Sequence, residues 1–308
     1  MRDTVVAARA VLLAGCLACA MLASPGTARA DSSDDERLAL LAPLAGRLSR
    51  VAFPSQAIGK TRAIYVYTPP GYRPTTAPLP VLVLLHGSPG NAMDWIVRGR
   101  VHVLIDKAIQ SGQLLPCLVV YANGIGPYYK GGSEWADSAD GSWRMESSIV
   151  QDLPRFICAR YRAASSASRW TLAGLSEGGY GAANLVVRNP HRFRGAVVLS
   201  GDFAVSDDWP DAHDVFGDDP VVRRQNSPIQ HIERLSPETR SALRFYVATG
   251  DADARVLTNA SDFVALCKRL GVWVRFDRGK GKHDWRFWSS RLAAALPVIS
   301  GWWREPEQ

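Results

Sequence analysis

One segment of this sequence has the pattern of a nucleophile held in a turn. Residues 170–189 read WTLAGLSEGGYGAANLVVRN, and an apolar stretch leads into GLSEG at 174–178. This is a G-x-S-x-G motif, and the residues before and after it predict a strand and a helix. In that context the serine occupies a strained turn, and the flanking glycines let the two backbones approach closely. Ser176 is therefore the predicted nucleophile.

A serine hydroxyl is a weak nucleophile and needs a base, together with an acid that orients the base. After such a turn the order along the chain is serine, acid, histidine. His283 alone among the six histidines comes late, in a glycine-bearing loop before the last predicted helix. The acid should follow the preceding strand, where Asp251 and Asp253 come directly after Gly250. Both aspartates cannot face one imidazole from an extended turn, so one is expected to be a turn or cap residue.

Hydrolysis through such a serine also needs two backbone N–H groups for the developing oxyanion. One is expected from Glu177, the residue after the nucleophile, and one from the turn HGSPG at 86–90. Pro89 has no N–H. Ser88 is therefore the predicted second donor.

Strands and helices alternate along the rest of the chain, which indicates βαβ units. We expect an α/β fold with a mainly parallel sheet of about eight strands and helices on both faces. Residues 201–243 interrupt the alternation and are predicted to form a short cap-like excursion. The predicted strands are 61–68, 81–85, 117–122, 170–173, 196–200, 245–249 and 272–276, and the predicted helices are 93–110, 145–161, 177–188, 256–270 and 285–296.

Two segments resemble metal or cofactor motifs but lack residues or spacing that these motifs require. The aspartate-rich residues 207–214 lack the spacing of a calcium loop. Gly124 and Gly126 lack the third glycine of a dinucleotide-binding loop. The sequence therefore predicts neither a metal nor another cofactor.

The first 30 residues read as a secretory signal, with a positive start, an apolar stretch at 11–23 and an A-x-A site at 28–30. The apolar stretch is shorter than the roughly 20 residues that cross a bilayer. We therefore expect a secreted or periplasmic protein that starts at Asp31, forms one catalytic domain over 31–308 and is not inserted stably in a membrane. A competing interpretation is a lipoprotein attached through Cys16, because LAGC resembles a lipoprotein box.

Composition places the 308 residues in the soluble globular class, with 47% hydrophobic and 21% charged residues. The formal net charge is +7 without a run of basic residues, so nucleic-acid binding is not expected. Loss of the leader would leave Cys117, Cys158 and Cys267, an odd number. Three small apolar side chains, or one disulfide and a free thiol, both fit this count.

The sequence resembles the putative esterase (esterase D) family of α/β-hydrolases over roughly residues 50–300. The matching segments are YTPPGY (67–72), LLHGSPGN (84–91), GLSEGGYGA (174–182), NPHRF (189–193) and GKHDWRFW (281–288). Relatives in that family include S-formylglutathione hydrolases, feruloyl, acetylxylan and siderophore esterases, and secreted mycolyltransferases. The resemblance places the family's G-x-x-D acid on Asp253 rather than Asp251. Many members carry methionine where this chain has Glu177, which predicts a different substrate preference.

These features predict a secreted serine esterase that acts through an acyl-enzyme on a small-molecule, glycan or lipid ester. An acyltransferase with a sugar or lipid alcohol acceptor is the close alternative, and a non-catalytic binding domain is a third. Four tryptophans lie in or near loops of the predicted active face, at 95, 135, 143 and 209. Trp95 and Trp143 are the predicted substrate-binding residues. The sequence does not predict an oligomeric state.

Overall fold

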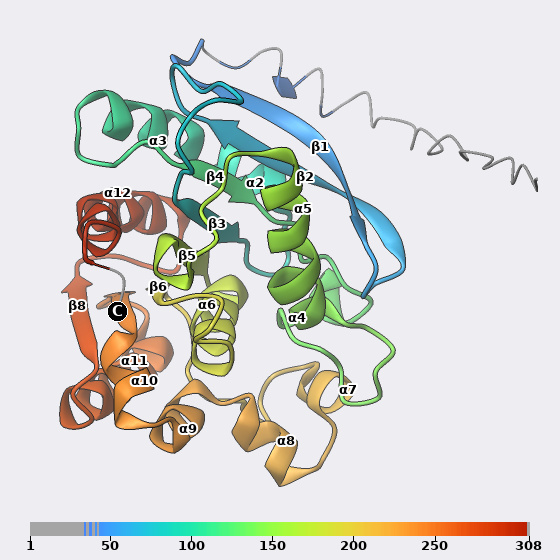
Figure 1. Cartoon of the computed structure of the whole chain (residues 1–308). Helices are drawn as coiled ribbons and strands as arrows, with labels where there is room; N and C mark the ends of the chain where they lie inside the picture. Colours follow the sequence, from blue (N-terminus) through green and yellow to red (C-terminus); the bar gives the residue numbers. More distant parts are fainter. Residues whose placement is uncertain (1–33, 35–36, 39–40, 42, 307–308) are drawn as a thin grey trace, which may run out of the picture.

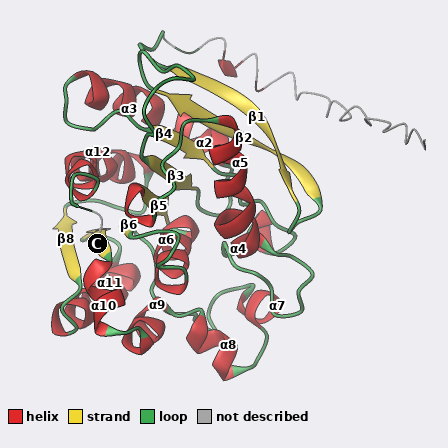
Figure 2. Ribbon diagram, viewed as in Figure 1, coloured by secondary structure: helices red, strands yellow, loops and turns green. Residues whose placement is uncertain are grey.

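An eight-stranded sheet forms the centre of the computed structural model, which describes Asp34, Arg37, Leu38, Leu41 and residues 43–306 (Figures 1 and 2). The predicted leader, including Cys16, lies outside the described residues. The strand order is β1-β2-β4-β3-β5-β6-β7-β8. The strands are β1 (Arg47–Ser55), β2 (Lys60–Thr68), β3 (Val81–Leu85), β4 (Leu118–Tyr121), β5 (Trp170–Leu175), β6 (Gly195–Leu199), β7 (Arg244–Gly250) and β8 (Trp273–Gly279).

The sheet is parallel from β4 to β8, while β1 and β2 form an antiparallel hairpin that joins it through β4. The expected α/β fold with a mainly parallel sheet is confirmed. β1 was not predicted from the sequence, because Arg47, Arg50 and Pro54 interrupt its apolar pattern. It lies at the sheet edge, where such residues are tolerated.

Helices cover both faces of the sheet, because the continuous apolar runs of the central strands are buried on two sides. In β3, Val81 and Val83 pack with α4, α5, α6 and α11, whereas Leu82 and Leu84 pack with α2, α3 and α12. The helices are α2 (Ala92–Val97), α3 (Val101–Gln110), α4 (Met145–Ser147), α5 (Leu153–Arg160), α6 (Glu177–Arg188), α7 (Ala212–Phe216), α8 (Pro220–Gln225), α9 (Pro228–His231), α10 (Pro237–Ala242), α11 (Ala254–Arg269) and α12 (Trp285–Trp302).

The single helix predicted over 93–110 is two helices, α2 and α3. The break falls at Gly99 and Arg100, and Arg100 takes a left-handed φ of 50°. A Cβ on Gly99 would lie 2.7 Å from the ring of Trp285, so this close approach requires glycine. Packing between distant segments therefore ends α2 where the local pattern predicts continuation.

The excursion at 201–243 contains the short helices α7 to α10, which gather at one end of the molecule (Figure 2). It is tied to α6, where the Tyr180 hydroxyl donates a hydrogen bond of 2.7 Å to the carbonyl of Asn226. Most of the excursion therefore lies beside α6, and only its first residues reach the site described below.

The three cysteines in the described part of the chain are all free thiols. Cys117 and Cys267 are buried, as small apolar side chains would be, whereas Cys158 is exposed. The alternative of one disulfide among these three is wrong for this structure.

Gly178 should tolerate no side chain. A Cβ there would lie 2.2 Å from the carbonyl oxygen of Leu85 and 2.4 Å from that of His86, and neither backbone atom can move aside cheaply. We expect Gly178→Ala to lower the free energy of unfolding by about 2–3 kcal/mol. The matched control is Gly301→Ala in α12, where nothing lies within 4 Å, and a gain of about 0.5–1 kcal/mol is expected. Chemical denaturation of both variants checks the difference, and equal stabilities would contradict the packing argument.

Candidate active site

Three side chains predicted from the sequence lie in a hydrogen-bonded row. Nε2 of His283 is 2.9 Å from Oγ of Ser176, and Nδ1 of His283 is 2.7 Å from Oδ2 of Asp253. They come from the segments that follow β5, β7 and β8, and the parallel pairing of these strands brings their carboxyl ends to one edge. The row has the connectivity of a serine nucleophile, an imidazole base and an orienting acid.

Ser176 is held in the strained turn that its motif predicts. Its φ is 55° and its ψ is −124°, and α6 starts at the next residue. A Cβ on Gly174 would lie 1.8 Å from the carbonyl oxygen of Gly178, so the turn closes only with glycine at that position. The Ser176 N–H donates to the carbonyl of Leu199, 2.9 Å away, which anchors the turn to β6.

Asp251 and Asp253 make different contacts. Asp251 Oδ1 accepts a hydrogen bond of 3.1 Å from the N–H of Gly281, two residues before His283. Asp251 therefore holds the loop that carries the imidazole, whereas Asp253 contacts the imidazole itself. Burial raises the pKa of Asp253, but the hydrogen bond and charge of His283 outweigh it, so the net pKa is below the ordinary value. Asp253 is thus kept as a carboxylate.

Ser88 and Glu177 line the same pocket as Ser176, with a volume of about 210 Å³. Glu177 is the first residue of α6, where backbone N–H groups have no partner within the helix. In the described part of the chain, no hydrogen bond uses the N–H of Ser88 or of Glu177. Both groups are therefore free to donate to an oxygen of a bound ester.

His86 is a positioning residue that sequence reasoning left unassigned. It is 2% exposed, and its Nδ1 lies 2.9 Å from the carbonyl oxygen of Gly87. Its Nε2 accepts a hydrogen bond of 2.9 Å from the N–H of Gly124. Both contacts are satisfied by the neutral ring protonated on Nδ1. His86 thereby fixes the turn that carries Ser88; its only signal in the sequence was its place at a strand end.

The carboxylate of Glu177 holds a strained loop against the site. Its Oε1 accepts hydrogen bonds from the N–H groups of Ser133 (2.9 Å) and Glu134 (2.8 Å). Lys130, Glu134 and Trp135 in this loop have positive φ angles of 50°, 50° and 52°. Burial raises the pKa of Glu177 to about 7 against the opposing effect of these two hydrogen bonds. A methionine could accept neither bond, so this carboxylate shapes the pocket wall.

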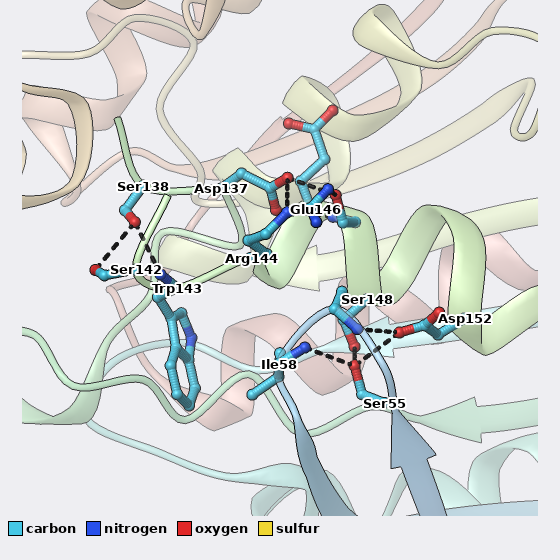
Figure 3. A network of polar contacts seen from close by, with 12 residues as sticks. Ser55, Ile58, Asp137, Ser138, Ser142, Trp143, Arg144, Glu146, Ser148 and Asp152 are labelled. Atoms are coloured by element: carbon cyan, nitrogen blue, oxygen red, sulfur yellow. Dashed lines mark hydrogen bonds and ion pairs between the residues drawn. The ribbon is translucent and has the colours of Figure 1, made fainter. Parts of the chain in front are cut away.

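Two predicted substrate-binding residues lie elsewhere. Trp95 is 0% exposed in the core and packs edge-on to Trp285, so it has no surface to offer a substrate. The backbone N–H of Trp143 donates a hydrogen bond to Oγ of Ser138 (Figure 3), and its ring lies beneath the cations of Lys60 and Arg62 in β2. Neither residue lines the pocket beside Ser176, so the structure does not bring these two predicted residues to the nucleophile.

Trp209 is the tryptophan that does line this pocket, edge-on to Tyr180 with ring centroids 4.8 Å apart. It belongs to the excursion, whose path the sequence did not predict. In the residues that the structure describes, no group of three or more histidine, cysteine, aspartate or glutamate side chains is arranged to hold a metal ion.

The fold and this row of side chains define an α/β-hydrolase. The model of the putative esterase family matches residues 55–299, and the chain belongs to that family.

Curated relatives include an acetyl esterase of Caldicellulosiruptor saccharolyticus, 25% identical over 72% of this chain and 84% of its own length. An endo-1,4-beta-xylanase/feruloyl esterase of Xylanibacter ruminicola is 31% identical over 51% of this chain, and an uncharacterized protein of Corynebacterium glutamicum is 25% identical over 78%. The matches span 22% and 57% of the lengths of these last two relatives.

Solved structures share the fold. A ferulic acid esterase superposes with a TM-score of 0.73 at 22% identity, covering 84% of this chain and 100% of its own. An S-formylglutathione hydrolase from Agrobacterium tumefaciens gives 0.71 at 20% identity, covering 85% of this chain and 97% of its own.

Burial lowers the pKa of His86 from 6.5 to about 4, which predicts a pH-dependent stability. Since the folded protein keeps this ring neutral, the unfolded chain binds more protons between these two values. This contribution, on the order of 3 kcal/mol, is present above the unfolded pKa and is lost as the pH falls toward 4. We expect His86→Gln to flatten the pH dependence of the free energy of unfolding in this window, measured by urea denaturation.

The control is His213→Gln, because His213 is exposed and its pKa is raised rather than lowered, by its hydrogen bond to Asp218. This variant should keep the downward trend of wild-type stability toward pH 4. A His86→Gln profile parallel to wild type would contradict the role given to the buried imidazole.

Proposed function

We propose that this chain is a serine carboxylic-ester hydrolase that works through an acyl-enzyme, and the observation that carries the proposal is the row Ser176–His283–Asp253. Ser176 Oγ attacks the ester carbonyl while its proton passes to His283 Nε2. Asp253 holds the ring tautomer and stabilises the imidazolium. The N–H groups of Ser88 and Glu177 bind the oxyanion.

His283 then protonates the leaving alcohol, which departs and leaves the acyl group on Ser176. A water molecule attacks this acyl-enzyme with His283 again as base, which releases the acid and restores the serine. An acyltransferase would follow the same path with an alcohol in place of water. No contact in the site favours an alcohol acceptor, so hydrolysis is the function we propose, and analysis of products with and without added sugar or lipid alcohol tests the choice.

Ser176→Ala should remove ester hydrolysis and leave the fold intact. The loss of a nucleophile that acts together with its base costs roughly 10⁴- to 10⁶-fold in kcat. The hydroxyl has no packing role in the described contacts beyond His283, so the melting temperature should stay close to that of wild type. Steady-state rates on p-nitrophenyl esters measure the effect. Wild-type turnover by a folded variant would rule out Ser176 as the nucleophile.

Substitutions of Asp253 and Asp251 should have different effects on activity and stability. We expect Asp253→Asn to lose about four decades of kcat, because the imidazole loses the acid that fixes its tautomer. We expect Asp251→Asn to keep much of its activity and to lose about 1 kcal/mol of stability, because only the bond to Gly281 is weakened. Paired measurements of kcat and melting temperature check this. The reverse pattern would move the acid to Asp251.

Export is a further part of the proposal, supported by the signal pattern in the first 30 residues. In the described residues no helix combines the length and apolar character needed to cross a bilayer. Expression of the full chain in a bacterial host should yield a processed protein that begins at Asp31, as read by N-terminal sequencing of the exported fraction. A lipid-modified start at Cys16 would instead support the lipoprotein interpretation.

A further inference from the structure

Three carboxyl groups meet in the pocket beside the nucleophile. Glu134, Glu177 and Asp211 all line the pocket that contains Ser176, and we refer to them as the acidic trio. Asp211 is 4% exposed and Glu134 is 9% exposed. The loop that follows η1 (Tyr129–Gly131) supplies Glu134, the start of α6 supplies Glu177, and the excursion supplies Asp211. Three separate segments thus bring carboxyl groups to one pocket of the active site.

The trio has unused hydrogen-bonding capacity. Glu177 Oε2 is fully buried and has no hydrogen-bond partner, while Oε1 is used by the strained loop. Burial, the charges of Glu177 and Asp211, and a hydrogen bond to the side chain of Asp211 raise the pKa of Glu134 well above its usual range. Glu134 is therefore the protonated donor of its bond to Asp211, and Glu177 Oε2 is the acceptor of the trio that has no partner.

The two cationic side chains that line this pocket, Arg255 and Lys130, have other contacts. Arg255, which lines the pocket, forms an ion pair of 2.7 Å with Asp202. Lys130 lies over the ring of Tyr129, with Nζ 4.9 Å from the ring centroid. Buried carboxylates without a counter-ion cost free energy. With Glu134 protonated, Asp211 and Glu177 are the groups that bring negative charge to the pocket beside Ser176, and a positive group supplied from outside would complement that charge.

We propose that the acidic trio binds the ammonium group of a cationic ester and so holds its scissile carbonyl beside Ser176. This inference rests on the proposed function and names a substrate class for it. An ammonium group offers several donors or a diffuse positive charge to Asp211 and to the unpartnered Oε2 of Glu177. Trp209 lines the same pocket, and an aromatic ring attracts a cation placed over its face. The proposed substrates share a positive group close to the ester bond, carried by either the acyl or the alcohol part.

Two pairs of substrates of matched shape test the proposal at neutral pH. Alanine ethyl ester and ethyl isobutyrate differ by a charged or neutral group on the acyl side. Acetylcholine and 3,3-dimethylbutyl acetate differ in the same way on the alcohol side. We expect the charged member of one pair to have a kcat/KM at least about 10-fold above its neutral partner. The pair that shows the preference identifies the part of the ester that carries the cation.

The preference should depend on the trio. Asp211→Asn is expected to lower the charged-to-neutral ratio of kcat/KM by about 10-fold or more, and Glu134→Gln provides a second variant if the first fails to fold. The matched control is Asp208→Asn, an exposed aspartate of the same excursion, which should keep the wild-type ratio. Melting temperatures confirm that the variants compared are folded.

A ratio near one for both pairs in the wild-type protein would overturn the cation site. So would a preference that survives in both trio variants, or the absence of turnover on all four esters. Labelling of Ser176 by a fluorophosphonate separates these failures from failure of the proposed function. A protein that labels but shows no charge preference still has its nucleophile, whereas a protein that does not label contradicts the hydrolase itself.

Discussion

The close contact between the turn at Ser176 and the end of β3 is the constraint on which the site depends. Gly174 and Gly178 let strand and helix approach until no side chain fits between them. The missing side chain of Gly178 also lets α6 contact the carbonyls of Leu85 and His86. One contact therefore tightens the nucleophile turn and brings the turn with Ser88 to the same pocket. His86, neutral and doubly hydrogen-bonded, keeps that second turn in place.

The carboxyl groups of the site fall into two sets, one with a lowered pKa and one with raised pKa values. Asp253 is paired with His283, which keeps its pKa low and its carboxylate ionised. Burial and the charges of the neighbouring Glu177 and Asp211 raise the pKa of Glu134. The first arrangement serves proton transfer at Ser176. The second arrangement is the basis on which we propose a cationic substrate. Glu177 joins the two parts, since its backbone N–H is a proposed oxyanion donor and its side chain belongs to the trio.

Short segments of the sequence predicted those parts of the fold and site that depend on neighbouring residues. The motif around Ser176, the order of the nucleophile and His283, and the parallel strands all follow from short segments read on their own. Asp251 and Asp253 remained alternatives until the resemblance was added, because both lie in one loop. They differ in their contacts with the loop 30 residues further along the chain, where Asp251 contacts Gly281 and Asp253 contacts His283. Trp95 was misassigned because its burial depends on Trp285, far along the sequence. The acidic trio had no signal, since the path of the excursion to Asp211 is a tertiary feature.

The central claim is that Ser176 is the one activated nucleophile of this chain, and mapping a covalent adduct tests it most directly. The intact protein would be treated with a fluorophosphonate, digested, and sequenced by tandem mass spectrometry. The account predicts one equivalent of adduct on Ser176, formed quickly in the folded protein and lost on denaturation before treatment. An adduct on a different residue, or no adduct in a folded protein, would contradict it.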